Sequence, residues 1–493
     1  MEDDDRGATY YRPVQRFGLL FGAAAFIAFL LLPAPESLGT EGWRTAAVAV
    51  LMAVWWMTEA IPIPGTAMLP LVLFPALGVL TPANASAPYA NELIFLFMGG
   101  FLLAVTMEKW GLHKRIALSI MALVGTSPNR LVLGFMISTG FLSMWINNTA
   151  TAAMLLPIAI AVGEMFRPQD RVGPYEFGIC LMLGVAYSAS IGGVATLIGT
   201  PATAILAGAA NEILDLQIGF VQWMAVGLPI VLIMLPITWF LLTRFLYRPG
   251  ALSGDAARIL GEERAGLGPP SRGEKITGVV FAGTALAWVL RAEKSFGGVT
   301  IPGIATFAPG VSDSTIAMTA AVLLFLIPVD WKNGEFTLEW RTARGIPWGV
   351  LVLFGGGLSL ARGMEVSGLA VWIGNSVSAL EAVPTLLILG AVATLLVFLT
   401  EVTSNTATAT MAMPVMAGVG LGLGIEPLLP MAAVAFGASM AFMLPVATPP
   451  NAIVFGSGYI TIPQMARAGF YLNLLSILVI TTLGMFLVPI FLR

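Results

Sequence analysis

Long stretches without a charged side chain recur along this 493-residue chain. A helix needs about 20 apolar residues to cross the ~30 Å apolar core of a bilayer, and each stretch reaches most or all of the way. One anchor helix cannot account for them, because the mean hydropathy of the whole chain is +0.89 and only 10% of its residues are charged. We therefore expect an all-α polytopic membrane protein. The stretches free of Asp, Glu, Lys and Arg are residues 60–91, 131–163, 177–211, 216–243, 427–466 and 468–492.

Charge and reactive side chains exclude several classes of protein. The net charge is only −3, so the chain lacks the basic field of a nucleic-acid-binding protein. The single cysteine, Cys180, excludes a disulfide framework and a thiolate zinc site, and we interpret it and the single histidine, His113, as structural. The start, Met1–Asp5, is acidic, which is not typical of a signal peptide. The first helix, about Phe17–Leu32, is therefore expected to stay in the mature protein.

A polar segment divides the chain near its middle. Residues 244–275 carry six basic and four acidic side chains and are interrupted by glycine and proline. Loops rich in Lys and Arg stay on the cytoplasmic side of a membrane, so we expect a cytoplasmic linker here. It separates an N-terminal repeat, residues 1–243, from a C-terminal repeat, residues 276–493. If six segments precede the linker, the N-terminus is cytoplasmic as well.

The two halves are duplicated copies. Shifting the sequence by 257 places aligns residues 97–112 with residues 354–369, with nine identities in sixteen positions. The same ungapped shift aligns residues 148–157 with residues 405–414, and each of these begins with Asn-Thr-Ala-Thr-Ala. A fixed internal shift of this kind indicates a fold built from structural repeats.

Each copy contains two apolar pieces that are too short to cross the bilayer as helices. In residues 131–163 the pieces flank Asn147-Asn148-Thr149, and in residues 384–420 they flank Ser404-Asn405-Thr406. We therefore predict two re-entrant helical hairpins with polar tips. Non-helical backbone at membrane depth persists only where protein or a water-filled cavity satisfies its polar groups. The tips are therefore expected to line a cavity.

Each copy also contains a long apolar segment with proline near its middle. Thr200-Pro201 lies within residues 177–211 and Thr448-Pro449 within residues 427–466, and the two blocks align at a shift of 248. Proline removes a backbone donor and clashes with the preceding turn, so we predict two broken helices. Interrupted segments at corresponding positions of two repeats indicate a transport site, where helix N-termini attract anions and freed carbonyls coordinate sodium.

Helix packing is the competing interpretation of these polar residues, because small and polar residues also mediate helix contacts in membranes. Their duplication at one ungapped shift, next to short segments both times, favours the transport site. Acidic residues in a membrane are also candidates for function. We expect Glu108, which a lysine follows, to lie near an interface, with Glu365 as its repeat partner. We expect Glu401, next to the second tip, to position a helix rather than carry protons.

At these positions the chain resembles the divalent anion/sodium symporter family, which includes sodium-coupled dicarboxylate, citrate and sulfate transporters and related exchangers. Members carry two Ser-Asn-Thr motifs at hairpin tips, each followed by a Thr-Pro or Ser-Pro segment in a broken helix. Residues 143–151 and 400–408 resemble the tips, and residues 199–201 and 447–451 resemble the breaks. The resemblance implies two inverted-topology repeats with about eleven membrane segments plus two re-entrant hairpins. It also implies a homodimer formed through a scaffold domain, and an elevator-type movement of the transport domain.

The resemblance also implies a binding site, carried over residue by residue. The sodium ligands of the first half would be Ser143, Asn147, Asn148 and the carbonyl of Gly199. Those of the second half would be Thr400, Thr403, Asn405 and the carbonyl of Ala447. Substrate carboxylates would meet Asn148, Thr149, Thr200, Ser404, Asn405, Thr406 and Thr448. Asn147 departs from the family, whose members usually have serine there, so the first tip carries a bulkier side chain.

The resulting hypothesis is sodium-coupled symport of C4-dicarboxylates such as succinate, malate and fumarate across the plasma membrane, without enzymatic activity. A sodium-independent dicarboxylate exchanger, or a citrate or sulfate carrier of the same fold, is the alternative. Ser143, Thr400 and Thr403 carry oxygen atoms, whereas a Lys or His at these positions could itself occupy a cation site. These residues therefore favour sodium symport over exchange. An ion channel is disfavoured because it would lack duplicated sites that close alternately. An intramembrane enzyme is disfavoured because it would need a His, Cys or acid cluster, which the apolar stretches of this sequence do not contain. The expected partners are a small dianionic carboxylate, Na⁺ as the co-transported ion, the lipid bilayer and a second copy of the chain, but no nucleic acid.

Overall fold

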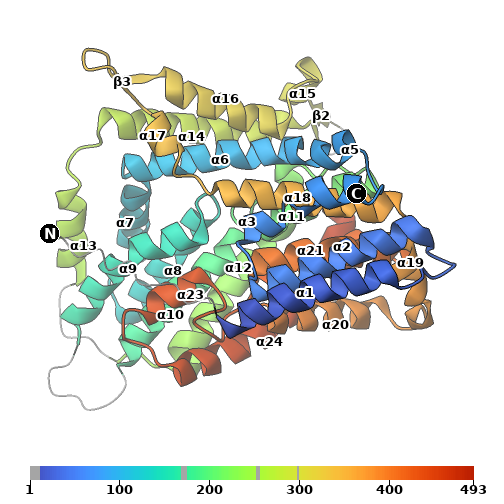
Figure 1. Cartoon of the computed structure of the whole chain (residues 1–493). Helices are drawn as coiled ribbons and strands as arrows, with labels where there is room; N and C mark the ends of the chain where they lie inside the picture. Colours follow the sequence, from blue (N-terminus) through green and yellow to red (C-terminus); the bar gives the residue numbers. More distant parts are fainter. Residues whose placement is uncertain (1–11, 168–174, 251–255, 297–298, 493) are drawn as a thin grey trace, which may run out of the picture.

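A computed structural model describes residues 12–167, 175–250, 256–296 and 299–492 of the chain. Its elements are almost all helices, many of them running side by side (Figure 1). Eight helical stretches among the described residues are long and apolar enough to cross a membrane, which confirms the expected all-α polytopic architecture. Two short antiparallel pairs of strands lie in the connections: β1 (Lys294–Phe296) with β2 (Val299–Ile301), and β3 (Pro328–Asp330) with β4 (Glu335–Phe336).

One group of helices, called here the outer set, comes from the start of each half. Its members are α1 (Pro13–Leu31), α2 (Gly39–Thr58), α3 (Ile63–Thr66), α4 (Leu69–Ala76), α5 (Pro82–Ser86), the 3-10 helix η1 (Ala87–Ala90), α6 (Glu92–Lys109), α14 (Arg272–Arg291), α15 (Ile304–Phe307), α16 (Asp313–Leu326), α17 (Trp340–Ala343) and α18 (Trp348–Val366). Within this set α1 packs on α2, α6 on α16, and α18 on η1. Glycines allow the closest approach, since a Cβ on Gly99 of α6 would meet the Ala317 backbone of α16 at 2.6 Å.

A second group, called here the inner set, comes from the end of each half. Its members are α8 (Pro128–Ser143), α9 (Asn148–Met165), α10 (Glu176–Gly193), α11 (Pro201–Leu214), α12 (Phe220–Phe240), the π-helix η2 (Leu241–Leu246), α20 (Thr385–Leu399), α21 (Asn405–Gly422), α22 (Leu428–Ser439), α23 (Pro449–Phe455) and α24 (Ile462–Phe491). The chain reverses between α8 and α9 and again between α20 and α21. It interrupts its helices at residues 194–200 and 440–448. The first reversal packs against α10, and the second packs against α22.

Connecting helices complete the fold: α7 (Leu112–Val124), α13 (Ala256–Gly266), α19 (Leu369–Ser376) and the 3-10 turn η3 (Ser378–Leu380). Both α7 and α19 begin after a glycine in the left-handed region, Gly111 at φ 72° and Gly368 at φ 73°, a conformation that favours glycine. The two glycines align in the duplication. Composition alone did not predict α13, which lies within the polar linker and packs against α7 and α9.

Basic residues gather at one end of the helices, called here the linker face. Lys114 of α7 pairs with Glu263 of α13 at 2.9 Å, and Arg115 pairs with Glu274 at the start of α14. Lys109 at the end of α6 lies 3.6 Å from Glu339, shortly before α18 begins. Figure 1 shows α7 and α13 at the left end of the molecule and α5 and α19 at the right end. The positive-inside rule predicts that the linker face is cytoplasmic.

Candidate functional site

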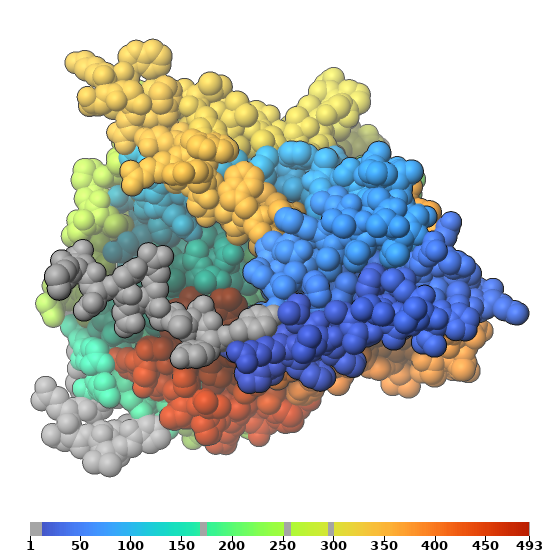
Figure 2. All heavy atoms as spheres, viewed as in Figure 1, coloured from blue at the N-terminus to red at the C-terminus, as the bar shows by residue number. Residues whose placement is uncertain are grey.

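The two hairpin tips and the two helix breaks meet at one cavity of about 310 Å³. Its walls include residues 147–149 and 404–406 from the tips, and residues 199–201 and 446–450 from the breaks. In Figure 2 teal atoms from the first half of the chain are visible in a recess between blue N-terminal and red C-terminal segments. Segments separated by more than 250 residues therefore build one site, as the duplication predicts for its paired motifs.

Helix N-termini surround this cavity. The first residues of α9, α11 and α21 are Asn148, Pro201 and Asn405, and all three line it. An N-terminus leaves backbone N–H groups without intrahelical partners and carries partial positive charge, so it favours an anion. The sequence builds these starts locally: Ser404 caps α21 by accepting the Ala407 N–H at 3.5 Å, and Pro201 suits a first helical position because it has no N–H to satisfy.

A cluster of oxygen atoms lies beside the first tip. The Ser143 hydroxyl donates to the Ala189 carbonyl at 2.7 Å and lies 2.5 Å from the Asn148 carboxamide. The same carboxamide lies 3.2 Å from the carbonyl oxygens of Gly199 and Ala189. The nitrogen of the carboxamide can donate to these oxygens. In the opposite orientation its oxygen would lie beside them, as a ligand of a cation would. Three of the four predicted ligands of the first sodium site, Ser143, Asn148 and Gly199, thus lie together.

Close backbone contact makes this cluster possible. A Cβ on Gly199 would meet the carbonyl oxygen of Gly193 at 2.3 Å and that of Ser143 at 2.8 Å. Such distances are too short for any side chain, so only glycine lets the first break approach the first tip. The tip itself is tied down by Thr196, whose hydroxyl donates to the Met144 carbonyl at 2.5 Å.

Asn147, the fourth predicted ligand, is used differently. Its side-chain oxygen accepts the Thr149 N–H at 2.7 Å and caps α9. Its backbone oxygen accepts the Thr151 N–H at 3.0 Å and the Thr151 hydroxyl at 3.1 Å. Both oxygens therefore serve the first turn of α9, although the residue lines the cavity.

The predicted residues of the second sodium site are more dispersed. Asn405 and Ala447 line the cavity, and the Asn405 side-chain oxygen is buried with no hydrogen-bond partner among the described residues. A buried oxygen without a partner is costly and suits a cation or an incoming donor. Thr403 lines an adjoining groove instead and bonds to Thr408 at 2.8 Å. Thr400 is buried, and its hydroxyl donates to the Val397 carbonyl of its own helix at 3.2 Å.

Glu401 fixes the second break to the second tip. Its carboxylate is buried and accepts the backbone N–H groups of Phe442, Met443 and Leu444 at 2.8 to 3.1 Å. The Asn473 amide of α24 donates to the same group at 2.7 Å. These contacts agree with the positioning role expected of Glu401, but the segment that it positions is the non-helical break rather than a helix.

Four cavity residues were not singled out from the sequence: Glu59, Ser190, Val350 and Val446. Ser190 of α10 has a buried hydroxyl without a hydrogen-bond partner among the described residues, and its counterpart at the 248 shift is Ala438, so the duplication gave no signal. Glu59 and Val350 belong to the outer set. Their position depends on how the two sets pack, and nothing in the local sequence reports that packing.

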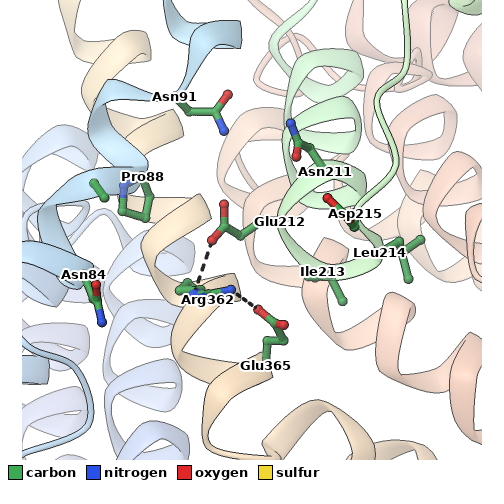
Figure 3. A pocket seen from close by; sticks show the side chains of 11 residues that line it. Asn84, Pro88, Asn91, Asn211, Glu212, Ile213, Leu214, Asp215, Arg362 and Glu365 are labelled. Carbon is green, nitrogen blue, oxygen red and sulfur yellow. Dashed lines mark hydrogen bonds and ion pairs between the residues drawn. The ribbon is translucent and has the colours of Figure 1, made fainter.

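A larger cavity of about 660 Å³ lies near the end of α11, away from the tips. Figure 3 shows Arg362 of α18 between two acids, Glu212 of α11 and Glu365 of its own helix. Its Nε lies 3.6 Å from Glu212 and its Nη1 lies 2.8 Å from Glu365. Arg362 is the one basic group among the described residues of this cavity, and it is paired to carboxylates with Asp215 nearby. The lining is therefore unfavourable for a dianion. The smaller cavity between the tips is the candidate site.

Comparisons with known proteins identify the family. The sequence profile described as "Sodium:sulfate symporter transmembrane region" matches residues 14–492. A sodium-dependent dicarboxylate transporter, SdcS, of Staphylococcus saprophyticus is 42% identical over 490 residues, which cover 97% of this chain and 92% of that protein. SdcS of Staphylococcus aureus strain USA300 is 41% identical over 487 residues, with the same coverage.

Among solved structures, the YdaH transporter of Alcanivorax borkumensis, reported as having an unusual topology, matches with a TM-score of 0.56. The match covers 96% of each chain at 15% identity, which shows a shared fold. The profile and the relatives show more than the fold, because they extend over nearly the whole chain at high identity. The chain therefore belongs to the sodium:sulfate symporter family, the divalent anion/sodium symporters, and is an integral membrane transporter rather than an enzyme.

Proposed function

We propose that this protein is a sodium-coupled symporter of C4-dicarboxylates such as succinate, malate and fumarate in the plasma membrane. The observation that carries the proposal is the cavity between the tips, where helix N-termini and uncharged donors adjoin a cluster of oxygen atoms. The names of the relatives, sodium-dependent dicarboxylate transporters, support both the ion and the substrate class.

The dianion is proposed to bind through neutral donors. Thr149, Thr200, Thr406 and Thr448 bring hydroxyls to the cavity, and none of its described lining residues is Lys, Arg or His. Hydrogen bonds from hydroxyl and amide groups hold a carboxylate more weakly than a fixed cation does. Release into the cell is then feasible, and the positive charge needed for tight binding enters and leaves with sodium.

Sodium is proposed to bind at the oxygen cluster of Ser143, Asn148 and Gly199, and beside Asn405 in the second half. Hydroxyl, carboxamide and carbonyl oxygens are the ligands that hard cations prefer. Asn148 and Asn405 both line the cavity, so each could contact an ion and the substrate. This shared position is the proposed physical basis of coupling.

We also propose that the inner set slides along the outer set as an elevator. The contact between α11 and α18 supports this. A Cβ added to Gly208 of α11 would meet the Leu358 side chain of α18 at 2.8 Å, and one turn further on Glu212 pairs with Arg362. Sliding along α18 would separate this ion pair. In a Cys180→Ser background, a disulfide between Glu212→Cys and Arg362→Cys should block uptake, and a reductant should restore it. Full uptake by the cross-linked protein would reject the sliding motion.

Uptake of labelled succinate into proteoliposomes tests the proposed function. An inward sodium gradient should drive accumulation, and an equal potassium gradient should not. Uptake that requires internal dicarboxylate and ignores sodium would assign the exchanger activity instead. Competition by unlabelled citrate and sulfate measures selectivity, and stronger competition by either than by malate would assign the alternative substrate.

A further inference from the structure

Glu59 is the acidic side chain on the path of the substrate. Of the described residues that line the cavity between the tips, it alone is charged. It also lines a second groove of about 250 Å³, together with Arg12, Gln15 and Ser404. The cavity and the groove therefore adjoin at Glu59, and a molecule that moves between them passes its carboxylate.

The backbone of Glu59 is held in place by the outer set. The residue ends α2 in the left-handed region at φ 49°, which is uncommon for a residue other than glycine. Its N–H donates to the Trp55 carbonyl, and its own carbonyl accepts the Gln15 amide of α1 at 3.2 Å. Gln15 in turn accepts the Arg12 N–H at 2.8 Å. This chain of bonds fixes where Glu59 stands, independently of the hairpin tips.

The carboxylate itself is available to act on a ligand. Glu59 is exposed, and among the described residues its carboxylate has neither an ion-pair nor a hydrogen-bond partner. The groove beyond Glu59 leads to Arg12 beside the start of α1. Val350 in the first turn of α18 lines the cavity between the tips, as Glu59 does. Glu339, which pairs with Lys109 at the linker face, precedes the start of α18 by nine residues. This chain order assigns the opening to the linker side, the predicted cytoplasmic side.

We propose that Glu59 is a specificity-determining residue that weakens dianion binding in the cavity and so favours release on the linker face. The proposal rests on the proposed function. While sodium occupies the site, its charge offsets the carboxylate. Once sodium leaves, the dianion faces an uncompensated negative charge, with Arg12 further out to attract it. Coulomb repulsion scales with the product of the charges, so a dianion is affected about twice as strongly as a monoanion.

Binding of succinate to the purified full-length protein tests this at low and at saturating sodium. Glu59→Gln should lower the succinate Kd about fivefold at low ionic strength. The effect should be smaller for monomethyl succinate and should shrink as salt is added. Glu59→Asp keeps the charge and should bind as the parent does. Glu59→Asn is a second neutral variant that suits the left-handed backbone. Glu36→Gln, which changes an exposed residue in the turn before α2, is the matched control.

Several results would overturn the proposal. One is an unchanged or raised succinate Kd in both neutral variants, and another is an equal shift for succinate and its monoester. A third is a loss of sodium affinity with unchanged succinate affinity, which would make Glu59 a group that recruits cations. The proposed function fails separately, because the parent protein would then show no sodium-dependent succinate binding at all.

Discussion

Replacing Glu401 by glutamine is expected to lower the stability of the protein by about 3 to 5 kcal/mol. Glu401 is only 4% exposed. Its carboxylate accepts three backbone N–H groups of residues 442–444 and the Asn473 amide, at 2.7 to 3.1 Å. A hydrogen bond to a charged acceptor contributes about 1.5 to 3 kcal/mol. The sum overstates the loss, because the mutation also removes the cost of burying a charge. Glutamine keeps one acceptor oxygen and turns an NH₂ group toward backbone donors.

Thermal unfolding in detergent, followed by tryptophan fluorescence, measures this loss. The control is Glu365→Gln, which removes an exposed carboxylate whose described partner is Arg362 of the same helix; an exposed pair contributes about 0 to 1 kcal/mol. The Glu401 variant should also lose sodium-driven uptake, because the break that carries Ala447 and Thr448 is no longer held against the second tip. An unfolding midpoint equal to that of the control, with uptake intact, would refute the positioning role.

Two further predictions concern the tips. Thr149→Ala and Thr406→Ala should each weaken succinate transport, since each removes a cavity hydroxyl whose hydrogen bond to a charged acceptor contributes about 1.5 to 3 kcal/mol. The unfolding midpoint of each variant should stay close to the parent value. Parental affinity and rate in both variants would show that the tips are not part of the binding site. Asn147→Ser should broaden selectivity toward citrate in competition assays, because a smaller residue that still caps α9 enlarges the cavity. An unchanged ratio of succinate to citrate affinity would argue against a steric role of Asn147.

The internal duplication made much of the site predictable. Matching Asn148 with Asn405 and Thr200 with Thr448 required no structure, and all four residues line one cavity. The physical reason is that each copy repeats the same local sequence pattern, which consists of a polar cap, a helix start and a proline at a helix break. These patterns depend only on residues that are close in the sequence. They can therefore be recognised in a single sequence without any knowledge of tertiary packing.

Contacts between the two sets could not be predicted in the same way. Glu59 reaches the cavity because the end of α2 lies beside the second tip, and its repeat position carries no matching acid. Three of the four groups that donate to Glu401 are backbone N–H groups about 40 residues further along the chain, which have no sequence signature. Thr400 and Thr403 were placed by family resemblance, and their hydroxyls bond within the hairpin rather than facing the cavity.

The central claim is that one cavity binds sodium and dicarboxylate together, and calorimetric titration of the purified protein with succinate at a series of sodium concentrations tests it most directly. Linkage requires each ligand to raise the affinity of the other by the same factor. We predict that the succinate Kd falls as sodium rises, and that Asn405→Asp abolishes succinate binding while sodium still stabilises the protein, because a fixed carboxylate there repels the dianion. A succinate affinity that is independent of sodium, or parental succinate binding by Asn405→Asp, would contradict the claim.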